Sequence, residues 1–270
     1  LSPGKKLRSK LLLNIAQKDE KSLRLCAIIE LIQAASLLHD DVIDDASLRR
    51  GQPATHRRLQ ALHRDRAWLG DARAFGASAA ILLGDLLLST AGEELAAAQA
   101  RAALSPDRAA AGRAAFDAMT AEVAVGQFLD VRSEVSALPA PEVDAAAAGQ
   151  AMLDSALAVV RHKSARYSVM HPLLIGALLG GVTTDSSLYA ALRVFGEEIG
   201  IAFQLRDDDL GVFGLPQVTG KPAGDDLREG KRTVLLALTW GRCDEAGRRM
   251  LGSVLANPEA TEEQIGEVAA

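Results

Sequence analysis

Several residue types and patterns are scarce in this 270-residue sequence, and each scarcity excludes a class of protein. Aromatic residues make up only 4% of the chain, and no stretch alternates apolar and polar residues as a half-buried strand does. Cysteine occurs twice, at Cys26 and Cys243, which excludes a disulfide framework and a cysteine metal cluster. Two isolated thiols favour a reducing compartment, so we expect a cytoplasmic location.

Excess basic charge and long apolar runs are also missing. The formal net charge of −5 argues against nucleic-acid binding, which requires a clustered basic surface. The longest apolar run, Leu173 to Val182, is shorter than the ~18 to 20 residues of a membrane span, so we expect none. The chain starts at Leu1 without a methionine and stops in a helical pattern at Ala270, so we expect both ends to be incomplete.

The residues that are plentiful favour helices. Ala, Leu, Arg and Glu have high helix propensity, and apolar residues recur at spacings of three and four between Gly- and Pro-rich breaks. This pattern predicts an all-α protein, a single large bundle in which residues 1–270 form one domain. The predicted helices cover about residues 5–17, 22–45, 57–66, 72–98, 107–134, 141–161, 163–180, 185–208, 231–242 and 244–255.

Four aspartates, Asp40, Asp41, Asp44 and Asp45, end a strongly apolar helix that begins near Leu23. Asp40 and Asp44 lie one turn apart on one face, where like charges repel each other and Asp is a poor helix former. A divalent cation would offset this repulsion, because carboxylates with waters and substrate phosphates are the ligands that Mg²⁺ prefers. A solvated, frayed helix end is the alternative interpretation.

The same arrangement occurs a second time, at Asp207, Asp208 and Asp209, at the end of an apolar helix that carries Ile199 and Phe203. Two acidic helix ends in one helical chain are hard to explain as two solvated caps. If the helices are neighbours, their carboxylates face a shared cavity, which is tolerable only with cations between them. The two clusters together therefore predict a metal site.

Basic residues accompany both acidic clusters. Arg49 and Arg50 follow the first, Lys221 and Lys231 follow the second, and Lys163 lies on a separate predicted helix. Arginine forks and lysine point charges hold phosphates in proteins, and Mg²⁺ commonly bridges carboxylates to phosphate. Each basic residue taken alone is better explained as a solvated surface charge, but their positions beside both clusters favour a diphosphate site.

In their order and separation these motifs resemble the trans-isoprenyl diphosphate synthases, the polyprenyl synthetase family, and most of all a geranylgeranyl diphosphate synthase. The resemblance implies a prenyltransferase of the isoprenoid synthase type, a single large all-α bundle around a central cavity, and a homodimer. It covers nearly the whole length through Gly4-Lys5-Lys6-Leu7-Arg8, Asp40-Asp41-Val42-Ile43-Asp44, Leu48-Arg49-Arg50-Gly51, Gly126-Gln127-Phe128-Leu129-Asp130, Lys163-Ser164-Ala165, Phe203-Gln204-Leu205-Arg206-Asp207-Asp208 and Gly230-Lys231-Arg232-Thr233.

In this family an allylic diphosphate ionises, the carbocation alkylates isopentenyl diphosphate in trans 1′-4 fashion, and a proton is lost. Mg²⁺ and cations stabilise the charge that gathers on the leaving diphosphate. The resemblance implies about three Mg²⁺ ions per active site, bound by Asp40, Asp44 and Asp207, with Asp41 and Asp208 as supporting carboxylates. It assigns the allylic diphosphate to Arg49, Lys163, Ser164, Gln204, Lys221 and Lys231, and isopentenyl diphosphate to Lys5, Arg8, Gln33 and Arg50.

The sequence departs from the family pattern at five positions. Gln33 stands where most members carry a histidine, and it can donate a hydrogen bond but cannot become cationic. The second acidic motif ends in Gly211 instead of a carboxylate, with Asp209 added in its middle, which puts a ligand at the fifth position in doubt. Ser9 replaces the usual proline and Ser164 the usual threonine, and we expect neither to abolish activity.

Product length in the family depends on how far the growing tail extends beneath the first acidic motif. Ala35 and Ser36 lie roughly 6 to 8 Å below Asp40 along the helix, where farnesyl-length members place an aromatic residue. Small residues leave the tunnel open, with Ile32 or a residue between 81 and 88 as its floor. We therefore expect geranylgeranyl diphosphate, with a longer or a farnesyl-length polyprenyl product as the alternative.

Three other classes of protein share part of this pattern. A class I terpene cyclase needs Asn, Ser and Glu ligands where this chain has aspartates after Gln204, and a ferritin-like bundle needs Glu-x-x-His pairs, which are absent from the sequence. A non-catalytic synthase subunit would lose acidic or basic members, nearly all of which persist, although Gln33 and Gly211 keep this alternative open. His39, beside the first cluster, is expected to pack against a neighbour and not to catalyse.

Overall fold

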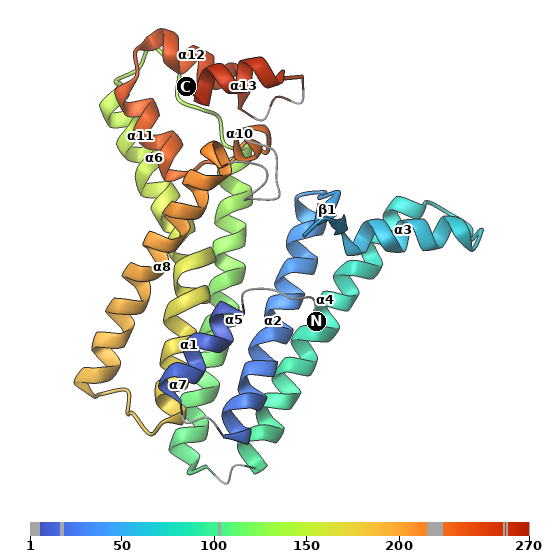
Figure 1. Cartoon of the computed structure of the whole chain (residues 1–270), viewed down its shortest axis with the longest axis vertical. Helices are drawn as coiled ribbons and strands as arrows, with labels where there is room; N and C mark the ends of the chain where they lie inside the picture. Colours follow the sequence, from blue (N-terminus) through green and yellow to red (C-terminus); the bar gives the residue numbers. More distant parts are fainter. Residues whose placement is uncertain are drawn as a thin grey trace. The chain divides into compact units, whose positions relative to one another are not determined.

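The computed structural model describes residues 6–16, 19–101, 104–214, 224–255, 257 and 259–269. Within these residues the chain is almost entirely helical, and its strands are two short ones (Figure 1). The prediction of an all-α protein is therefore confirmed. The chain divides into two compact units, one formed by residues 1–116 and 172–190 and the other by residues 117–171 and 191–270.

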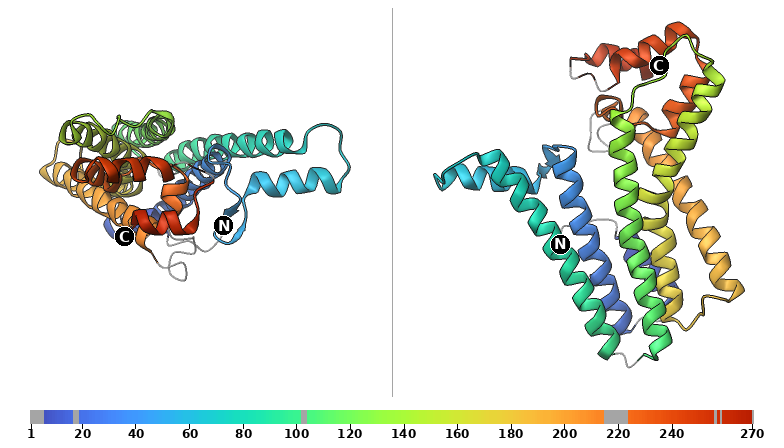
Figure 2. Two further views of the ribbon diagram at one scale, coloured as in Figure 1. Left: turned by 90° about the horizontal axis from the view of Figure 1, so that it is seen from above. Right: turned by 180° about the vertical axis from the view of Figure 1, so that it is seen from behind.

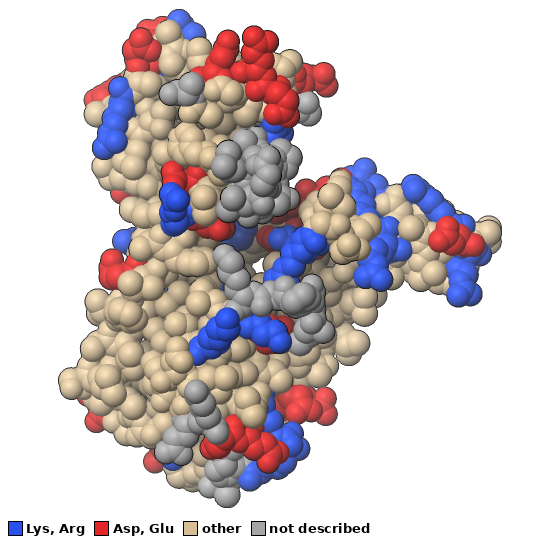
Figure 3. Space-filling model, viewed as in Figure 1, with Lys and Arg blue, Asp and Glu red and all other residues tan. Residues whose placement is uncertain are grey.

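The first unit is built around two long antiparallel helices. Figure 2 shows α2 and α4 side by side, and α3 packs along the start of α4 in an arm on which basic side chains gather in Figure 3. The elements of this unit are α1 (Leu7–Ile15), α2 (Glu20–Ile43), β1 (Leu48–Arg49), β2 (Gln52–Pro53), α3 (Thr55–Asp65), α4 (Ala72–Arg101), the start of α5 (Pro106–Val135), most of α7 (His171–Leu179) and the start of α8 (Ser187–Phe213).

A glycine lets α2 and α4 approach closely. A Cβ atom at Gly84 of α4 would lie 2.5 Å from Cδ2 of His39, so the imidazole ring of α2 occupies the space of that missing side chain. His39 Nε2 also lies 3.1 Å from the carbonyl oxygen of Ile81. His39 therefore packs against α4, as the sequence predicts.

The apolar side of α2 forms the core of the first unit. Asp19 caps the helix by accepting a hydrogen bond from the Ser22 amide at 2.8 Å, and Ile28 and Ile32 are almost completely buried. Ser9 joins α1 to this helix, because its buried hydroxyl donates to Glu30 Oε1 at 2.6 Å. The serine that replaces the family's proline thus has a packing role.

The second unit contains the rest of α5 and α8 with α6 (Ala145–Val159), the π-helix η1 (Val160–Met170), α10 (Asp225–Arg228), α11 (Val234–Arg242), α12 (Glu245–Val254) and α13 (Glu262–Ala269). Helices α6 and α11 touch at their backbones, because a Cβ atom at Gly149 would lie 2.6 Å from the Cα of Gly241. Trp240 fills the core of this unit and packs with Leu236, Leu251 and neighbouring apolar side chains.

The structure differs from the predicted helix ranges at three places. Helix α6 begins at Ala145, not near 141, because Asp144 caps it by accepting from the amide of Ala146 at 2.9 Å. The predicted break between 161 and 163 is instead a continuous helix that widens into η1. Helix α8 continues to Phe213, past Asp207 and Asp209, because this last turn buries Val212 in the core.

Two helices have the length and composition of membrane spans. An 18-residue window within residues 22–43 of α2 has a mean hydropathy of 1.3 and one within α4 has 1.6, and 39% and 22% of these windows are buried. The same properties occur in core helices of soluble proteins, and α2 carries Asp40 and Asp41 in its last turn. The expected absence of a membrane span stays a prediction.

Truncation of Trp240 tests the core of the second unit. Trp240 is 1% exposed, so Trp240→Ala should lower the free energy of unfolding by about 3 to 5 kcal/mol through lost burial and an internal cavity. Trp68→Ala is the control, because Trp68 is 49% exposed and should cost about 1 kcal/mol or less. Urea denaturation followed by circular dichroism measures both, and equal losses would contradict this core.

Candidate active site

The first acidic cluster lies at the end of α2 and is held by an arginine. Asp40 and Asp41 are in the last turn, and Asp44 follows as the C-cap. Arg49 Nε donates to Asp41 Oδ1 at 2.6 Å, and its Nη2 donates to Asp40 Oδ2 at 3.1 Å. Asp41 is 3% exposed, so this pairing compensates a carboxylate that packing removes from water.

A tight hairpin brings Arg49 to these aspartates. Strands β1 and β2 pair Arg49 with Gln52 in antiparallel register, and the two residues between them, Arg50 and Gly51, have φ angles of 56° and 73°. Two consecutive left-handed residues are the mark of a type I′ turn, which glycine adopts without strain. The backbone of this turn therefore places Arg49 beside α2 and leaves Arg50 exposed.

The fourth aspartate of the cluster has a separate role. Asp45 Oδ2 lies 2.8 Å from Arg57 Nη2 and 3.1 Å from Arg73 Nη2, so it joins α3 and the start of α4 to the end of α2. Asp45, to which the resemblance assigns no metal role, thus has a structural partner set of its own.

The second acidic cluster lies within α8. Asp207 is exposed, whereas Asp208 is buried and accepts a hydrogen bond from Gln204 Nε2 at 2.7 Å. Burial raises the pKa of Asp208 to about 6, and the nearby carboxylates of Asp226 and Asp207 add to that rise. Negative charge is therefore concentrated at this part of α8, as it would be around a cation site.

A carboxylate that the sequence analysis missed stands beside the departure at Gly211. A Cβ atom at Gly211 would lie 2.6 Å from the Cγ of Asp226, so the side chain of Asp226 fills the space that a longer residue would occupy. Asp226 is buried and comes from α10. A carboxylate from another helix thus lies where the second motif lacks its own last acid.

Two predicted phosphate-binding lysines pair with acids in the second unit. Lys231 Nζ lies 2.7 Å from Glu229 Oε2 and 3.8 Å from Asp226 Oδ1. Lys163 Nζ donates to Asp130 Oδ2 at 2.5 Å, and Lys163 and Ser164 both lie on η1. Asp130 is the last residue of the motif that begins at Gly126. Like Asp226, it had no assigned role in the sequence, and the structure places it as the partner of Lys163.

Some of the predicted substrate-binding residues are not brought together by the structure. Arg8 on α1 and Gln33 on α2 are half-buried in the first unit. Lys5 and Lys221 lie outside the described residues. Because the two acidic clusters belong to different units, the shared cavity between them stays a prediction.

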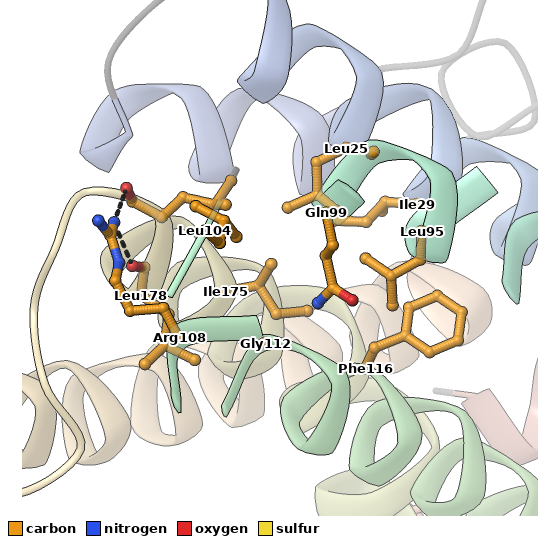
Figure 4. Close-up of a pocket in the computed structure, with 12 residues that line it drawn as sticks. Leu25, Ile29, Leu95, Gln99, Leu104, Arg108, Gly112, Phe116, Ile175 and Leu178 are labelled. Atoms are coloured by element: carbon orange, nitrogen blue, oxygen red, sulfur yellow. Dashed lines mark hydrogen bonds between the residues drawn. The ribbon is translucent and has the colours of Figure 1, made fainter. Parts of the chain in front are cut away.

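An apolar cavity that opens to solvent lies in the first unit. It holds about 620 Å³ of empty space, counted together with its opening, and Figure 4 shows apolar side chains pointing into it. Its polar members are satisfied, since Arg108 donates to the carbonyl of Leu179 at 2.8 Å and Gln99 to that of Ala109 at 2.8 Å. The residues that line it are Leu25, Ile29, Leu95, Ala98, Gln99, Leu104, Arg108, Gly112, Phe116, Ile175, Leu178 and Leu179.

The acidic side chains fit Mg²⁺ because all of their potential ligand atoms are carboxylate oxygens. Asp44 and Asp207 are also exposed, so an ion could reach them. As placed in the described part of the chain, no group of three or more His, Cys, Asp or Glu side chains could hold a metal ion unaided. Mg²⁺ commonly keeps several waters and completes its shell with substrate phosphates. These carboxylates would therefore bind it together with a diphosphate.

Comparison with known proteins decides the family. The family model described as polyprenyl synthetase matches residues 1–270. The chain belongs to the polyprenyl synthetase family. A polyprenyl synthetase relative of known structure, the geranylgeranyl pyrophosphate synthase of Corynebacterium glutamicum complexed with isoprenyl diphosphate and magnesium, is 38% identical with a TM-score of 0.85, covering 100% of this chain and 74% of that one.

Relatives in this polyprenyl synthetase family differ in product. A (2E,6E)-farnesyl diphosphate synthase of Mycobacterium tuberculosis is 34% identical over 244 residues, which are 89% of this chain and 58% of the relative. A geranylgeranyl diphosphate synthase of Sulfolobus acidocaldarius is 30% identical over an alignment of 272 positions, which covers 98% of this chain and 71% of the relative. The chain therefore spans less than two thirds of the mycobacterial enzyme it matches.

A methyl group at Gly211 tests the approach of Asp226. Gly211→Ala should lower the free energy of unfolding by about 1 to 3 kcal/mol, because the new Cβ overlaps the Asp226 carboxylate. Gly266→Ala in α13 is the control: nothing lies within 4 Å of its Cβ, so it should gain about 0.5 to 1 kcal/mol from helix propensity. Thermal denaturation of both variants measures the difference, and a stabilised Gly211→Ala protein would contradict the contact.

Proposed function

We propose that this chain carries the catalytic region of a Mg²⁺-dependent trans-isoprenyl diphosphate synthase, which condenses an allylic diphosphate with isopentenyl diphosphate. The proposal depends on the cations that accompany the acidic motifs: Arg49 pairs with the first motif, and Lys231 lies 3.8 Å from Asp226, the carboxylate beside Gly211 of the second. Such an arrangement suits a reaction whose leaving group is a diphosphate. The family model matches 1–270, which supports one synthase domain made of both units.

The proposed metal ligands are Asp40, Asp44 and Asp207, and bound Mg²⁺ would neutralise the charge that develops on the leaving diphosphate. Asp41 and Asp208 are the buried members of their clusters, which suits a supporting role. Asp41 accepts a hydrogen bond from Arg49 and so fixes its guanidinium beside Asp40, and Asp208 accepts a hydrogen bond from the side-chain amide of Gln204. Each motif thus combines an accessible carboxylate with a buried one that fixes its neighbours.

The remaining polar residues hold the two substrates in this proposal. Lysine and arginine suit diphosphate oxygens as donors that stay charged at neutral pH. The allylic diphosphate would contact Arg49, Lys163, Ser164, Gln204, Lys221 and Lys231, and isopentenyl diphosphate would contact Lys5, Arg8, Gln33 and Arg50. Of the residues proposed for isopentenyl diphosphate, Arg8, Gln33 and Arg50 belong to the first unit, whereas Lys163 and Lys231 of the allylic site belong to the second.

We further propose geranylgeranyl diphosphate as the product. Ala35 is fully buried on α2 and small, so it leaves room beneath Asp40. Ile32, also fully buried, comes next and would form the floor. Beyond it, roughly 16 to 23 Å from Asp40 along α2, Leu25 and Ile29 line the apolar cavity. That cavity is where a longer chain would extend if Ile32 were smaller.

A second copy of the chain is the proposed partner. Four large apolar side chains of α4 stay exposed in the single chain, and exposed apolar side chains gathered in this way are typical of a protein interface. They are Ile81, Leu82, Leu83 and Leu86, of which Leu82 is 67% exposed. The cytoplasmic location predicted from the cysteines stays a prediction, and both thiols are free.

Removal of single carboxylates tests the metal assignment. Asp40→Ala and Asp207→Ala should each lower kcat by on the order of 100-fold or more, since a metal ion supplies several kcal/mol of charge stabilisation. Asp209→Ala is the matched control on α8, because Asp209 pairs with Arg206 and has no proposed metal role. Condensation of isopentenyl diphosphate with each allylic primer is measured in Mg²⁺ and after chelation; full activity of either variant would refute the assignment.

Substitutions along α2 test the proposed tunnel. Ala35→Phe and Ser36→Phe should shorten the product, because an aromatic ring would block the path beneath Asp40. Ile32→Ala should lengthen it by opening the way to the cavity lined by Ile29. Ala27→Phe, on the exposed side of α2, should leave chain length unchanged. Chromatography of the dephosphorylated products gives the lengths, and an unchanged product in the first two variants would exclude this wall.

A further inference from the structure

The segment that carries Lys163 and Ser164 is a π-helix of 11 residues, η1, between α6 and α7. π-Helical turns are rare, and they are wider than α-helical turns because each amide bonds to the fifth residue before it. A widened helix of this length needs support from its neighbours. The supports lie on α5 and α8, and all the contacts that follow are within the second unit.

Two glycines bring the neighbouring helices against the backbone of η1. A Cβ atom at Gly126 of α5 would lie 2.5 Å from the Cα of Lys163, and one at Gly200 of α8 would lie 2.6 Å from the Cα of Ala165. No side chain fits at either position without displacing backbone. The wide helix is therefore held between two helices at the residues that flank Ser164.

A single carboxylate gathers three donors around this contact. Glu122 precedes Gly126 by one turn on the same face of α5, and its Oε1 accepts from Arg166 Nη1 at 2.5 Å and from His162 Nδ1 at 2.8 Å. Its Oε2 accepts from His171 Nε2 at 2.7 Å. These three donors cover η1 from its first turn to the residue that follows it. One side chain therefore ties both ends of the widened segment to α5.

Arg166 extends the same network to the opposite helix. Its Nε and Nη2 donate to the two oxygens of Glu197 at 3.0 and 3.2 Å, and Glu197 lies three residues before Gly200 on α8. Only 18% of the Glu122 side chain is exposed. Burial alone would raise the pKa of Glu122, but hydrogen bonds from Arg166 and His171 outweigh it and lower that pKa. The carboxylate is therefore ionised at neutral pH and bridges donors that packing holds in place.

We propose that Glu122 is a positioning residue for the allylic diphosphate site, because it sets the widened turn from which η1 presents Lys163 and Ser164. The inference rests on the proposed function of those two residues. The hydrogen bonds of Glu122 go to Arg166, His162 and His171. Two turns further along the same face of α5, Asp130 accepts the hydrogen bond of the Lys163 ammonium, so Glu122 holds the backbone and Asp130 the side chain.

Neutralising Glu122 without changing its shape tests the proposal. Glu122→Gln should raise the KM of the allylic diphosphate and lower kcat/KM on the order of tenfold to a hundredfold, because small displacements of a binding group cost that much. The KM of isopentenyl diphosphate should stay unchanged, because its proposed contacts lie in the other unit. Glu198→Gln is the matched control: Glu198 is exposed on α8, and the described residues give it no ion pair.

Hydrogen exchange supplies a readout that does not depend on turnover. In Glu122→Gln the amides of residues 160–170 should exchange faster than in the native protein, with α11 and α12 unchanged. Glu197→Gln should give the same kinetic and exchange pattern from the α8 side, and it replaces Glu122→Gln if that variant fails to fold.

Two outcomes would overturn the inference. One is an unchanged allylic KM in both variants, and the other is a KM that rises equally for both substrates, since that would indicate general destabilisation. If the native protein does not condense isopentenyl diphosphate with any allylic diphosphate, the proposed function is wrong. Exchange in residues 160–170 then still decides whether Glu122 holds η1.

Discussion

The pairing of buried or half-buried carboxylates with cations from other segments, seen at Asp41, Glu122 and Asp130, is the constraint on which much of this structure depends. Removing an ionised carboxylate from water costs several kcal/mol unless a donor replaces the lost hydration. Asp41 meets this cost with Arg49, Asp130 with Lys163, and Glu122 with Arg166. Each pair joins elements that are distant in sequence. The charges that would bind substrates therefore also determine where the hairpin, η1 and α5 lie within their units.

Close helix packing makes these pairs short enough to form. Short ion pairs between helices require backbones that approach one another, and glycine permits this where any Cβ would collide. Gly84 admits the ring of His39, and Gly126 and Gly200 admit the backbone of η1 from two sides. Gly211 follows the same rule with a different consequence, since the space it leaves is filled by the carboxylate of Asp226. The departure from the family motif is thus coupled to a neighbouring acid.

Much of the fold could be read from apolar spacing. The long helices α2, α4 and α5 lie within a few residues of the predicted ranges, because a sustained spacing of three and four has one structural solution at that length. The π-helix η1 could not be predicted from apolar spacing, because Lys163 and Ser164 interrupt the apolar pattern in the same way as a break between two helices does. The end of α8 was missed for a similar reason: three aspartates argue for a helix end, and burial of Val212 overrides them.

The sequence by itself determined the helical class, the two acidic motifs and the family, because these depend on residue type and order along the chain. It also indicated the predicted site residues, from Asp40 to Lys231. Only the tertiary structure decided the partners of those residues: Arg49 on Asp41, Asp130 on Lys163, Asp226 beside Gly211 and the three donors on Glu122. Hydrogen bonds between segments some 8 to 49 residues apart depend on helix packing, and no local pattern encodes that distance.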